Sequence, residues 1–166
     1  MEGSGIEPPA FPPLLLLTAA MHYLNTDHLK RCIQTLDMSL RMYQEAEQDS
    51  VDSEVFRNAV VKGYELAQET AFKLLRKALK EFGHGGQKLN GLMVRELLRL
   101  AAQHGLMTLE EVERWFVYRA NRNNTAHDYG EGFAKETLVL LPGFMVDITH
   151  LAEVLDTQFG PGRAGT

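Results

Sequence analysis

The amino-acid sequence predicts an all-α protein, an antiparallel helical bundle of about five helices. Apolar residues recur every three to four positions in successive segments, which is the period of a helix that buries one face. Residues that begin and end helices separate these segments, and no segment shows the alternating pattern of a strand. With 166 residues, 45% hydrophobic and 23% charged, the chain has the length and composition of one folded domain.

The first two predicted helices form the first half of the bundle. Thr26 and Asp27 are good N-terminal caps, and the polar stretch 48–52 ends the helix that follows them. The second helix is long and is expected to run from near Ser53 to Gly83, where glycine permits a C-terminal stop. The next residues, 84–87, are predicted to form a loop.

Three further helices complete the prediction. One is expected from Asn90 to about Gln103. Thr108 and Glu111 have the spacing of a capping box, in which each side chain binds the other residue's backbone N–H, and a helix with Val112, Trp115 and Phe116 in the core follows. The last helix is expected over residues 132–157, kinked or split at Pro142-Gly143.

The ends of the chain differ in composition from the middle. Four of the six prolines precede Leu14, so residues 1–25 are predicted to be an extended arm, residues 26–157 the helical domain and residues 158–166 a flexible tail. A single cysteine, Cys32, at an apolar position suggests a buried thiol and a reducing, cytoplasmic location. We find no segment with the length of a membrane span and expect no membrane association.

Charge is unevenly distributed. The net charge is −5, but residues 57–99 contain nine basic and four acidic residues. Local basic surface therefore exists, although a solvated helix face is its ordinary explanation. Charge alone neither indicates nor excludes a nucleic-acid substrate.

The segment 119–129, between the last two predicted helices, breaks the helical pattern. It holds three asparagines and a threonine, which favour turns and caps, together with Arg122, His127, Asp128 and Tyr129. Residues five apart on a continuous helix point about 140° apart. A break at the asparagines would let Arg122 and His127 reach one cleft, where histidine can act as an acid or base and arginine can bind phosphate. A capped turn with a surface arginine is an equally good interpretation of these residues alone.

The pattern Arg122-x4-His127-x-Tyr129, with the polar Asn123 after the arginine, resembles the HEPN superfamily. It is most similar to the nucleotidyltransferase substrate-binding protein branch, whose members pair with minimal nucleotidyltransferases. The likeness covers roughly residues 26–157 and includes residues 64–70 and 94–97.

This resemblance implies a helical homodimer that acts as an RNase toxin in a toxin–antitoxin pair. Arg122 and His127 would be the catalytic residues, at a cleft formed by two subunits and without metal or other cofactor. Asn123 and Thr125 would hold the turn or position the substrate, with Asp128 as a further supporting residue.

The resemblance also implies a partner, a minimal nucleotidyltransferase that forms a heterotetramer or larger complex with the homodimer. This partner would attach AMP to Tyr129 and silence the toxin. A purely structural tyrosine at a helix start is the alternative for Tyr129. The alternative for the whole protein is a non-catalytic subunit that binds a substrate or nucleotide for the nucleotidyltransferase.

Two further sets of residues allow more than one interpretation. Glu65 and Glu69, one turn apart, could reach the cleft or belong to a solvated face. Helical bundles can also hold di-iron sites, and Glu81/His84 and Asp147/His150 have a related spacing, but a di-iron site needs two Glu-x-x-His motifs and two more glutamates. We therefore expect no metal site.

Overall fold

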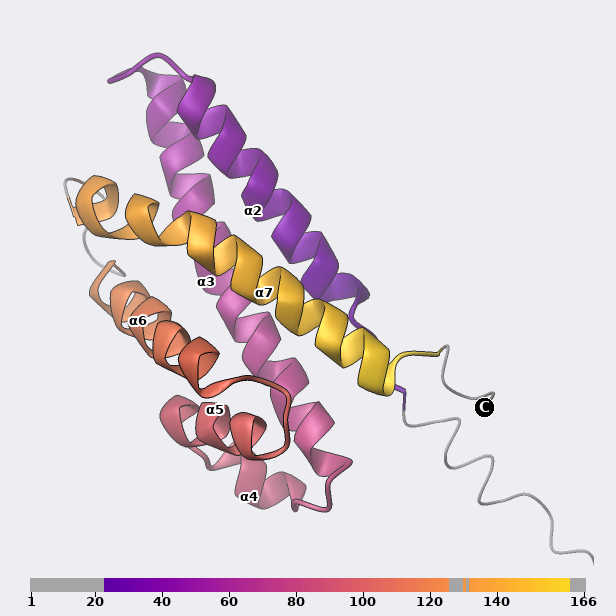
Figure 1. The fold of residues 1–166 in the computed structure, drawn as a ribbon. Helices are drawn as coiled ribbons and strands as arrows, with labels where there is room; N and C mark the ends of the chain where they lie inside the picture. The colour runs from indigo at the N-terminus through magenta and orange to yellow at the C-terminus, as the bar shows by residue number, and fades with distance from the viewer. Residues whose placement is uncertain (1–22, 126–129, 131, 162–166) are drawn as a thin grey trace, which may run out of the picture.

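A computed structural model describes residues 23–125, 130 and 132–161 of the chain. Within these residues every regular element is a helix, and short turns and loops connect them, which confirms the predicted fold class (Figure 1). The elements follow one another in the order α2 (Asp27–Glu45), α3 (Val51–Lys80), α4 (Gly86–Asn90), α5 (Val94–Gln103), α6 (Leu109–Thr125), the π-helix η1 (Phe133–Thr137) and α7 (Leu138–Phe159).

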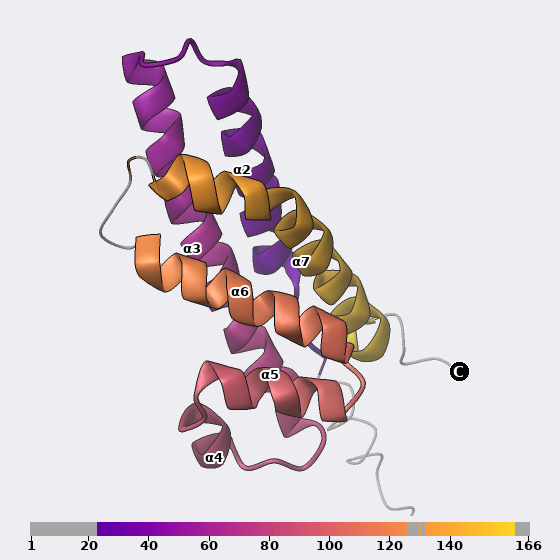
Figure 2. The ribbon, with the colours of Figure 1, turned by 60° about the vertical axis from the view of Figure 1, so that its left-hand side comes forward.

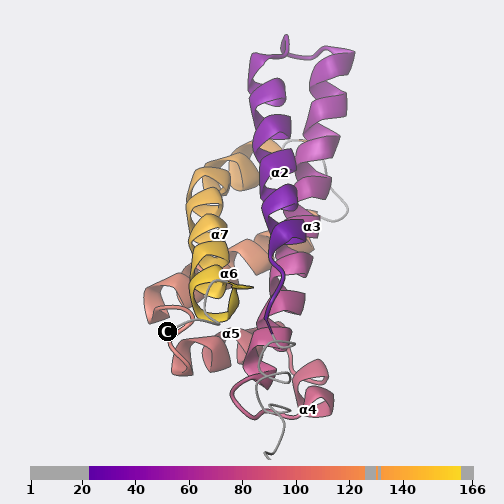
Figure 3. The same ribbon diagram turned by 90° about the vertical axis from the view of Figure 1, so that its right-hand side faces the viewer.

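Helices α2 and α3 form a long antiparallel pair that supports the rest of the bundle (Figure 3). Helix α2 begins where expected, with the Asp27 backbone N–H donating to Asn25 Oδ1 at 2.9 Å. Helix α3 begins two residues earlier than predicted, because Ser50 caps it by accepting from the Ser53 backbone N–H at 3.1 Å. Cys32, predicted to be buried, is only partly buried.

The segment after α3 differs from the prediction. Gly83 adopts a positive φ of 89°, as a helix stop requires. The predicted loop 84–87 is in part the start of the short helix α4, and α5 begins at Val94 rather than at Asn90. At the start of α5 the Glu96 carboxylate accepts from the Met93 backbone N–H at 3.2 Å, so the cap is supplied by residue 96 and not by an asparagine.

Helix α6 starts with the predicted capping box. The Thr108 backbone N–H donates to Glu111 Oε2 at 2.7 Å, and the Glu111 backbone N–H donates to Thr108 Oγ1 at 3.1 Å. Helix α6 then crosses α3 and ends beside η1 (Figure 2). The cap thus fixes the start of the helix that carries Arg122 at its other end.

The final helical segment is irregular at a different place from the one predicted. Pro142 lies inside a continuous α7, and the irregular turn is η1, one turn earlier. A proline cannot donate to the carbonyl four residues before it, and a wider turn nearby is one way in which a helix accommodates this defect. By length and composition, the segment Phe133–Phe159 could also cross a membrane, contrary to our expectation. Its buried residues, which include Phe144 and Ile148, belong to the core of the bundle.

Aromatic residues where α3, α6 and α7 meet make up the centre of the core. The Tyr64 and Phe144 rings meet edge to face at 4.7 Å between centroids, and the Trp115 ring contacts Phe144 at 5.5 Å and Phe72 at 5.8 Å. Trp115 is fully buried, as predicted, whereas Phe116 is only partly buried. Phe116 is therefore available for contacts at the surface.

A buried polar network joins α6 to α7. Asp147 is 5% exposed and accepts two hydrogen bonds of 2.8 Å from Arg114 and one of 2.6 Å from the Tyr118 hydroxyl. Burial alone would raise the pKa of Asp147, but the bonds from Arg114 and Tyr118 and the charge of Arg114 outweigh it and lower this pKa. The carboxylate therefore stays charged at neutral pH and holds α6 in place.

Candidate active site

The predicted catalytic segment begins on the last turns of α6. Arg122, Asn123 and Thr125 belong to this helix. His127, Asp128 and Tyr129 lie outside the described residues, so the convergence of Arg122 and His127 in one cleft stays a prediction.

The asparagines do not break the helix, contrary to our expectation, because α6 continues to Thr125. Tertiary contacts explain the difference. Asn121 is 6% exposed, and its Oδ1 accepts from the Thr137 hydroxyl of η1 at 3.1 Å. A buried hydrogen bond of this kind outweighs the low helix propensity of asparagine, which amounts to a few tenths of a kcal/mol.

Arg122 is held by two carboxylates of α3. Its Nη2 atom lies 2.9 Å from Glu65 Oε1 and 3.0 Å from Glu69 Oε1. Its Nη1 atom donates to Asn123 Oδ1 at 3.2 Å. Only 22% of the Arg122 side chain is exposed, against 29% and 42% for the two glutamates. Glu65 and Glu69 therefore face Arg122 and are not a simple solvated face.

The backbone below Arg122 is bound to α3 as well. The Tyr118 carbonyl oxygen, one turn earlier on α6, accepts from the Tyr64 hydroxyl at 3.1 Å and from Gln68 Nε2 at 3.2 Å. Burial, followed by the proximity of Tyr118, raises the pKa of Tyr64, so its hydroxyl keeps its proton as a donor. These two bonds fix the height and rotation of α6 on α3, and with them the place of the Arg122 guanidinium.

A second arginine, Arg119, lies one turn before Arg122. Its guanidinium is 5.7 Å from the centre of the Phe72 ring. Burial and the charge of Arg122 lower the pKa of Arg119, and the carboxylates of Glu69 and Glu65 oppose this shift. Because the ordinary pKa of an arginine lies far above neutral pH, the side chain stays charged. Two positive and two negative groups thus share this end of the bundle.

Space for a ligand adjoins this cluster. A groove of about 300 Å³ is lined by Asn58, Val61, Lys62 and Glu65. Lys62 Nζ lies 3.7 Å from Glu65 Oε2 and adds a third cation nearby. A phosphate entering the groove would meet Lys62 and could reach Arg122 by displacing a carboxylate.

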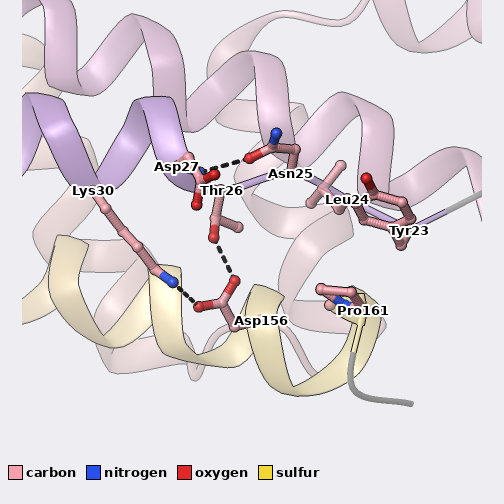
Figure 4. A pocket seen from close by; sticks show the side chains of 9 residues that line it. Tyr23, Leu24, Asn25, Thr26, Asp27, Lys30, Asp156 and Pro161 are labelled. Carbon is pink, nitrogen blue, oxygen red and sulfur yellow. Dashed lines mark hydrogen bonds and ion pairs between the residues drawn. The ribbon is translucent and has the colours of Figure 1, made fainter. Parts of the chain in front are cut away.

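A larger pocket lies at the C-terminal end of α7, where the described residues begin and end (Figure 4). Two of its charged groups bind each other, since Asp156 pairs with Lys30 and also accepts from the Thr26 hydroxyl. The Leu24 backbone N–H also donates to the Phe159 carbonyl at 2.8 Å, so this junction ties the two ends of the domain together.

The residues considered for a metal site have other partners. Asp147 binds Arg114 and Tyr118, His150 Nδ1 contacts Glu111, and His84 Nε2 lies 2.8 Å from His104 Nε2. Across residues 23–125, 130 and 132–161, no group of three or more His, Cys, Asp or Glu residues could hold a metal ion.

Sequence reasoning missed two features of the site. The Asn121–Thr137 bond joins segments 16 residues apart and leaves no local pattern. Arg119 was inside the segment that we singled out, and its spacing of three residues from Arg122 places both on neighbouring parts of one helix face. In a helix that continues to residue 125, this spacing is the sequence signal that places Arg119 beside Arg122.

The comparisons with known proteins agree on one family and one fold. The family described as "nucleotidyltransferase substrate binding protein like" matches residues 24–157. The chain is 22% identical over 108 residues to a probable ribonuclease HepT of Haemophilus influenzae. These aligned residues cover 65% of this chain and 73% of that protein.

Two solved structures share the fold. One is a tri-AMPylated HEPN toxin of Shewanella oneidensis in complex with its MNT antitoxin, with a TM-score of 0.62 and 16% identity over 86% of this chain and 97% of that chain. The other is a toxin–antitoxin crystal structure with AMP-PNP, with a TM-score of 0.53 and 16% identity over 78% of this chain and 98% of that chain.

Proposed function

We propose that this chain, which belongs to the nucleotidyltransferase substrate-binding protein-like family, is the HEPN toxin of a toxin–antitoxin pair and cleaves RNA without a metal ion. The observation that carries the proposal is the position of Arg122, held at the end of α6 by Glu65 and Glu69 and next to an open groove. The similarity to a probable ribonuclease and to HEPN toxins supports the same activity.

Arg122 supplies the charge that the reaction needs. Its planar guanidinium matches two phosphate oxygens, and it stabilises negative charge as this builds up on the phosphate. Glu65 and Glu69 keep the side chain oriented before substrate binds. Asn123 contributes by accepting from Arg122 Nη1 at 3.2 Å.

His127 acts as the base in this proposal. It takes the proton of a ribose 2′-hydroxyl, whose oxygen then attacks the adjacent phosphorus. The bond from phosphorus to the 5′ oxygen breaks, and the leaving oxygen takes up a proton. Thr125 and Asp128 support the turn that carries His127.

The working unit is a homodimer in which the motifs of two copies face one cleft. The partner is a minimal nucleotidyltransferase, which transfers AMP to the hydroxyl of Tyr129. Tyr129 is only seven residues from Arg122, so the added phosphate would compete with RNA for the same guanidinium. The modification would therefore silence the toxin.

A second function is favoured by the description of the family itself. Under this second function, the chain is a non-catalytic subunit that presents a substrate or nucleotide to the nucleotidyltransferase, and Arg122 only binds phosphate. The two functions differ in whether His127 is needed for a chemical step.

Cleavage of a labelled RNA by the purified full-length chain separates them. We expect His127→Ala to slow cleavage by about 10²–10⁴-fold, the usual contribution of a positioned acid or base. His28→Ala, which removes an imidazole from α2, is the matched control and should leave the rate unchanged. A wild-type homodimer that cleaves no RNA while binding the nucleotidyltransferase would exclude the nuclease and leave the binding subunit.

A further inference from the structure

Three arginines near the site lie over aromatic rings. On α5, the guanidinium carbons of Arg95 and Arg99 lie 4.6 and 5.5 Å from the centre of the Phe116 ring of α6. The guanidinium of Arg119 lies 5.7 Å from the centre of the Phe72 ring. Contacts of this kind hold the flat guanidinium group over the ring and leave its N–H groups pointing outward.

These arginines combine a contact with an aromatic ring with the lack of a bound acidic group, a lack that Arg31, Arg57 and Arg76 share among the described residues. Across the part of the chain that the structure describes, the guanidiniums of Arg95, Arg99 and Arg119 form no hydrogen bond and no ion pair. By contrast, Arg114 makes two bonds of 2.8 Å to Asp147, and Arg41 pairs with Asp37 at 2.8 Å. The unpaired N–H groups are suited to an external anion.

The three arginines lead toward Arg122. Phe116, Arg119 and Arg122 are each three residues apart on α6, so each adjoins the next, and the path that they follow turns by about 60° around the helix at each step. From residue 116 to residue 122 the helix rises about 9 Å, at 1.5 Å per residue. Arg95 and Arg99 extend this path onto α5, which packs beside α6 (Figure 2).

Alternation of cations and aromatic rings along a path is the pattern by which proteins bind single-stranded nucleic acid. The cations follow the phosphates, and planar groups stack on unpaired bases. A guanidinium lying over an aromatic ring provides both kinds of contact. Arg95 and Arg99 are also exposed, while Phe116 and Arg119 are partly buried, so the path can be reached from solvent.

We propose that Arg95, Arg99 and Arg119 form a track that binds single-stranded RNA and directs it to Arg122. This inference rests on the proposed function and specifies the form of the substrate and the surface it follows. Glu65 and Glu69 act against RNA binding at the end of the track, where they compete for Arg122. Arg119 is near the same carboxylates, so the track's attraction for RNA comes mainly from Arg95 and Arg99 on α5.

The test measures binding of a fluorescein-labelled single-stranded oligoribonucleotide to the full-length chain, in a His127→Ala background that prevents cleavage. The test variant is Arg95→Gln with Arg99→Gln. The matched control is Arg31→Gln with Arg41→Gln on α2, which removes the same charge at exposed positions. Binding is measured by anisotropy over a range of salt concentrations.

We expect the test variant to bind the RNA about tenfold more weakly at low salt. The slope of the logarithm of its binding constant against the logarithm of salt concentration should be shallower by about 1.4, because two phosphate contacts on a single strand are lost. The control should change affinity less than about twofold, since its charges are distant from the track. Equal affinity of the test and control variants would overturn the proposal. So would a test variant that keeps its RNA affinity and loses only its affinity for the nucleotidyltransferase.

The outcome can be distinguished from failure of the nuclease function. If the wild-type chain cleaves RNA and the test variant binds normally, the nuclease stands and the track is wrong. If no cleavage is seen but RNA binding depends on Arg95 and Arg99, the track stands and the nuclease is wrong.

Discussion

Replacing Asp147 by alanine removes the acceptor that joins α6 to α7, and the structure allows the cost to be worked out. The Tyr118 hydroxyl, in a residue 3% exposed, would lose its bond of 2.6 Å, and an unsatisfied buried hydroxyl costs about 2 kcal/mol. Arg114 is 49% exposed and can turn to water, so losing its two bonds adds about 1 kcal/mol. The total of about 3 kcal/mol is at the lower end of the range for a broken buried ion pair.

Urea denaturation followed by circular dichroism measures this cost, at one protein concentration because the proposed homodimer would also stabilise the fold. For a slope of about 2 kcal/mol per molar, the midpoint should fall by about 1.5 M. The control is Asp37→Ala, which breaks an exposed pair with Arg41 on α2 and should cost under about 0.5 kcal/mol. Equal costs for the two variants would refute the assignment of Asp147 as the bond between α6 and α7.

The pH dependence gives a second check on the same residue. Because hydrogen bonds and the charge of Arg114 lower the pKa of Asp147 in the folded state, its stabilisation is present above the unfolded pKa of about 3.9. It is lost as pH falls through the lower folded pKa. The stability difference between wild type and Asp147→Ala should therefore be larger at pH 7 than at pH 2.5, and a difference that grows on acidification would contradict this reasoning.

Two further predictions concern the active-site cluster and the backbone. Changing Glu65 and Glu69 together to glutamine should tighten RNA binding in the His127→Ala background by about sevenfold. Each negative charge about 7 Å from a phosphate costs about 0.6 kcal/mol of binding free energy in water, and the double change removes two. Unchanged affinity, measured by anisotropy, would show that these carboxylates do not compete with phosphate. Gly105→Ala should lower the free energy of unfolding by about 1–2 kcal/mol, because Gly105 has a φ of 74°, which residues with a side chain rarely adopt. The added methyl group would meet no other atom, so this cost would come from the backbone alone. Gly85→Ala is the control, because a methyl group at Gly85 would also meet no atom and the φ of Gly85 is −65°. If both variants lose the same stability in urea denaturation, backbone strain is excluded as the cause.

Local sequence patterns were sufficient for features fixed by neighbouring residues. The start of α2 at Asp27 and the capping box of Thr108 and Glu111 depend on side chains within three residues of the backbone groups they bind. The helical period of the apolar residues likewise identified Val112 and Trp115 as core.

Features fixed by distant residues were not predicted. Asparagines at 121, 123 and 124 favour a turn locally, yet α6 continues because Thr137 binds Asn121 and α3 binds Arg122. Glu65 and Glu69 are 57 and 53 residues from Arg122, so only the fold shows that they meet. Pro142 itself was read correctly as a source of irregularity, but the irregular turn is η1, one turn earlier than expected.

The toxin that we propose is silenced by nucleotidyl transfer to Tyr129, close in sequence to Arg122. The most direct test is the intact mass of the chain after incubation with ATP, magnesium and its partner nucleotidyltransferase, for wild type and Tyr129→Phe. We predict that the wild-type chain gains the mass of one or more AMP groups and that Tyr129→Phe gains none. A wild-type chain that gains no mass although the two proteins form a stable complex, or a Tyr129→Phe variant that is modified as before, would contradict the account.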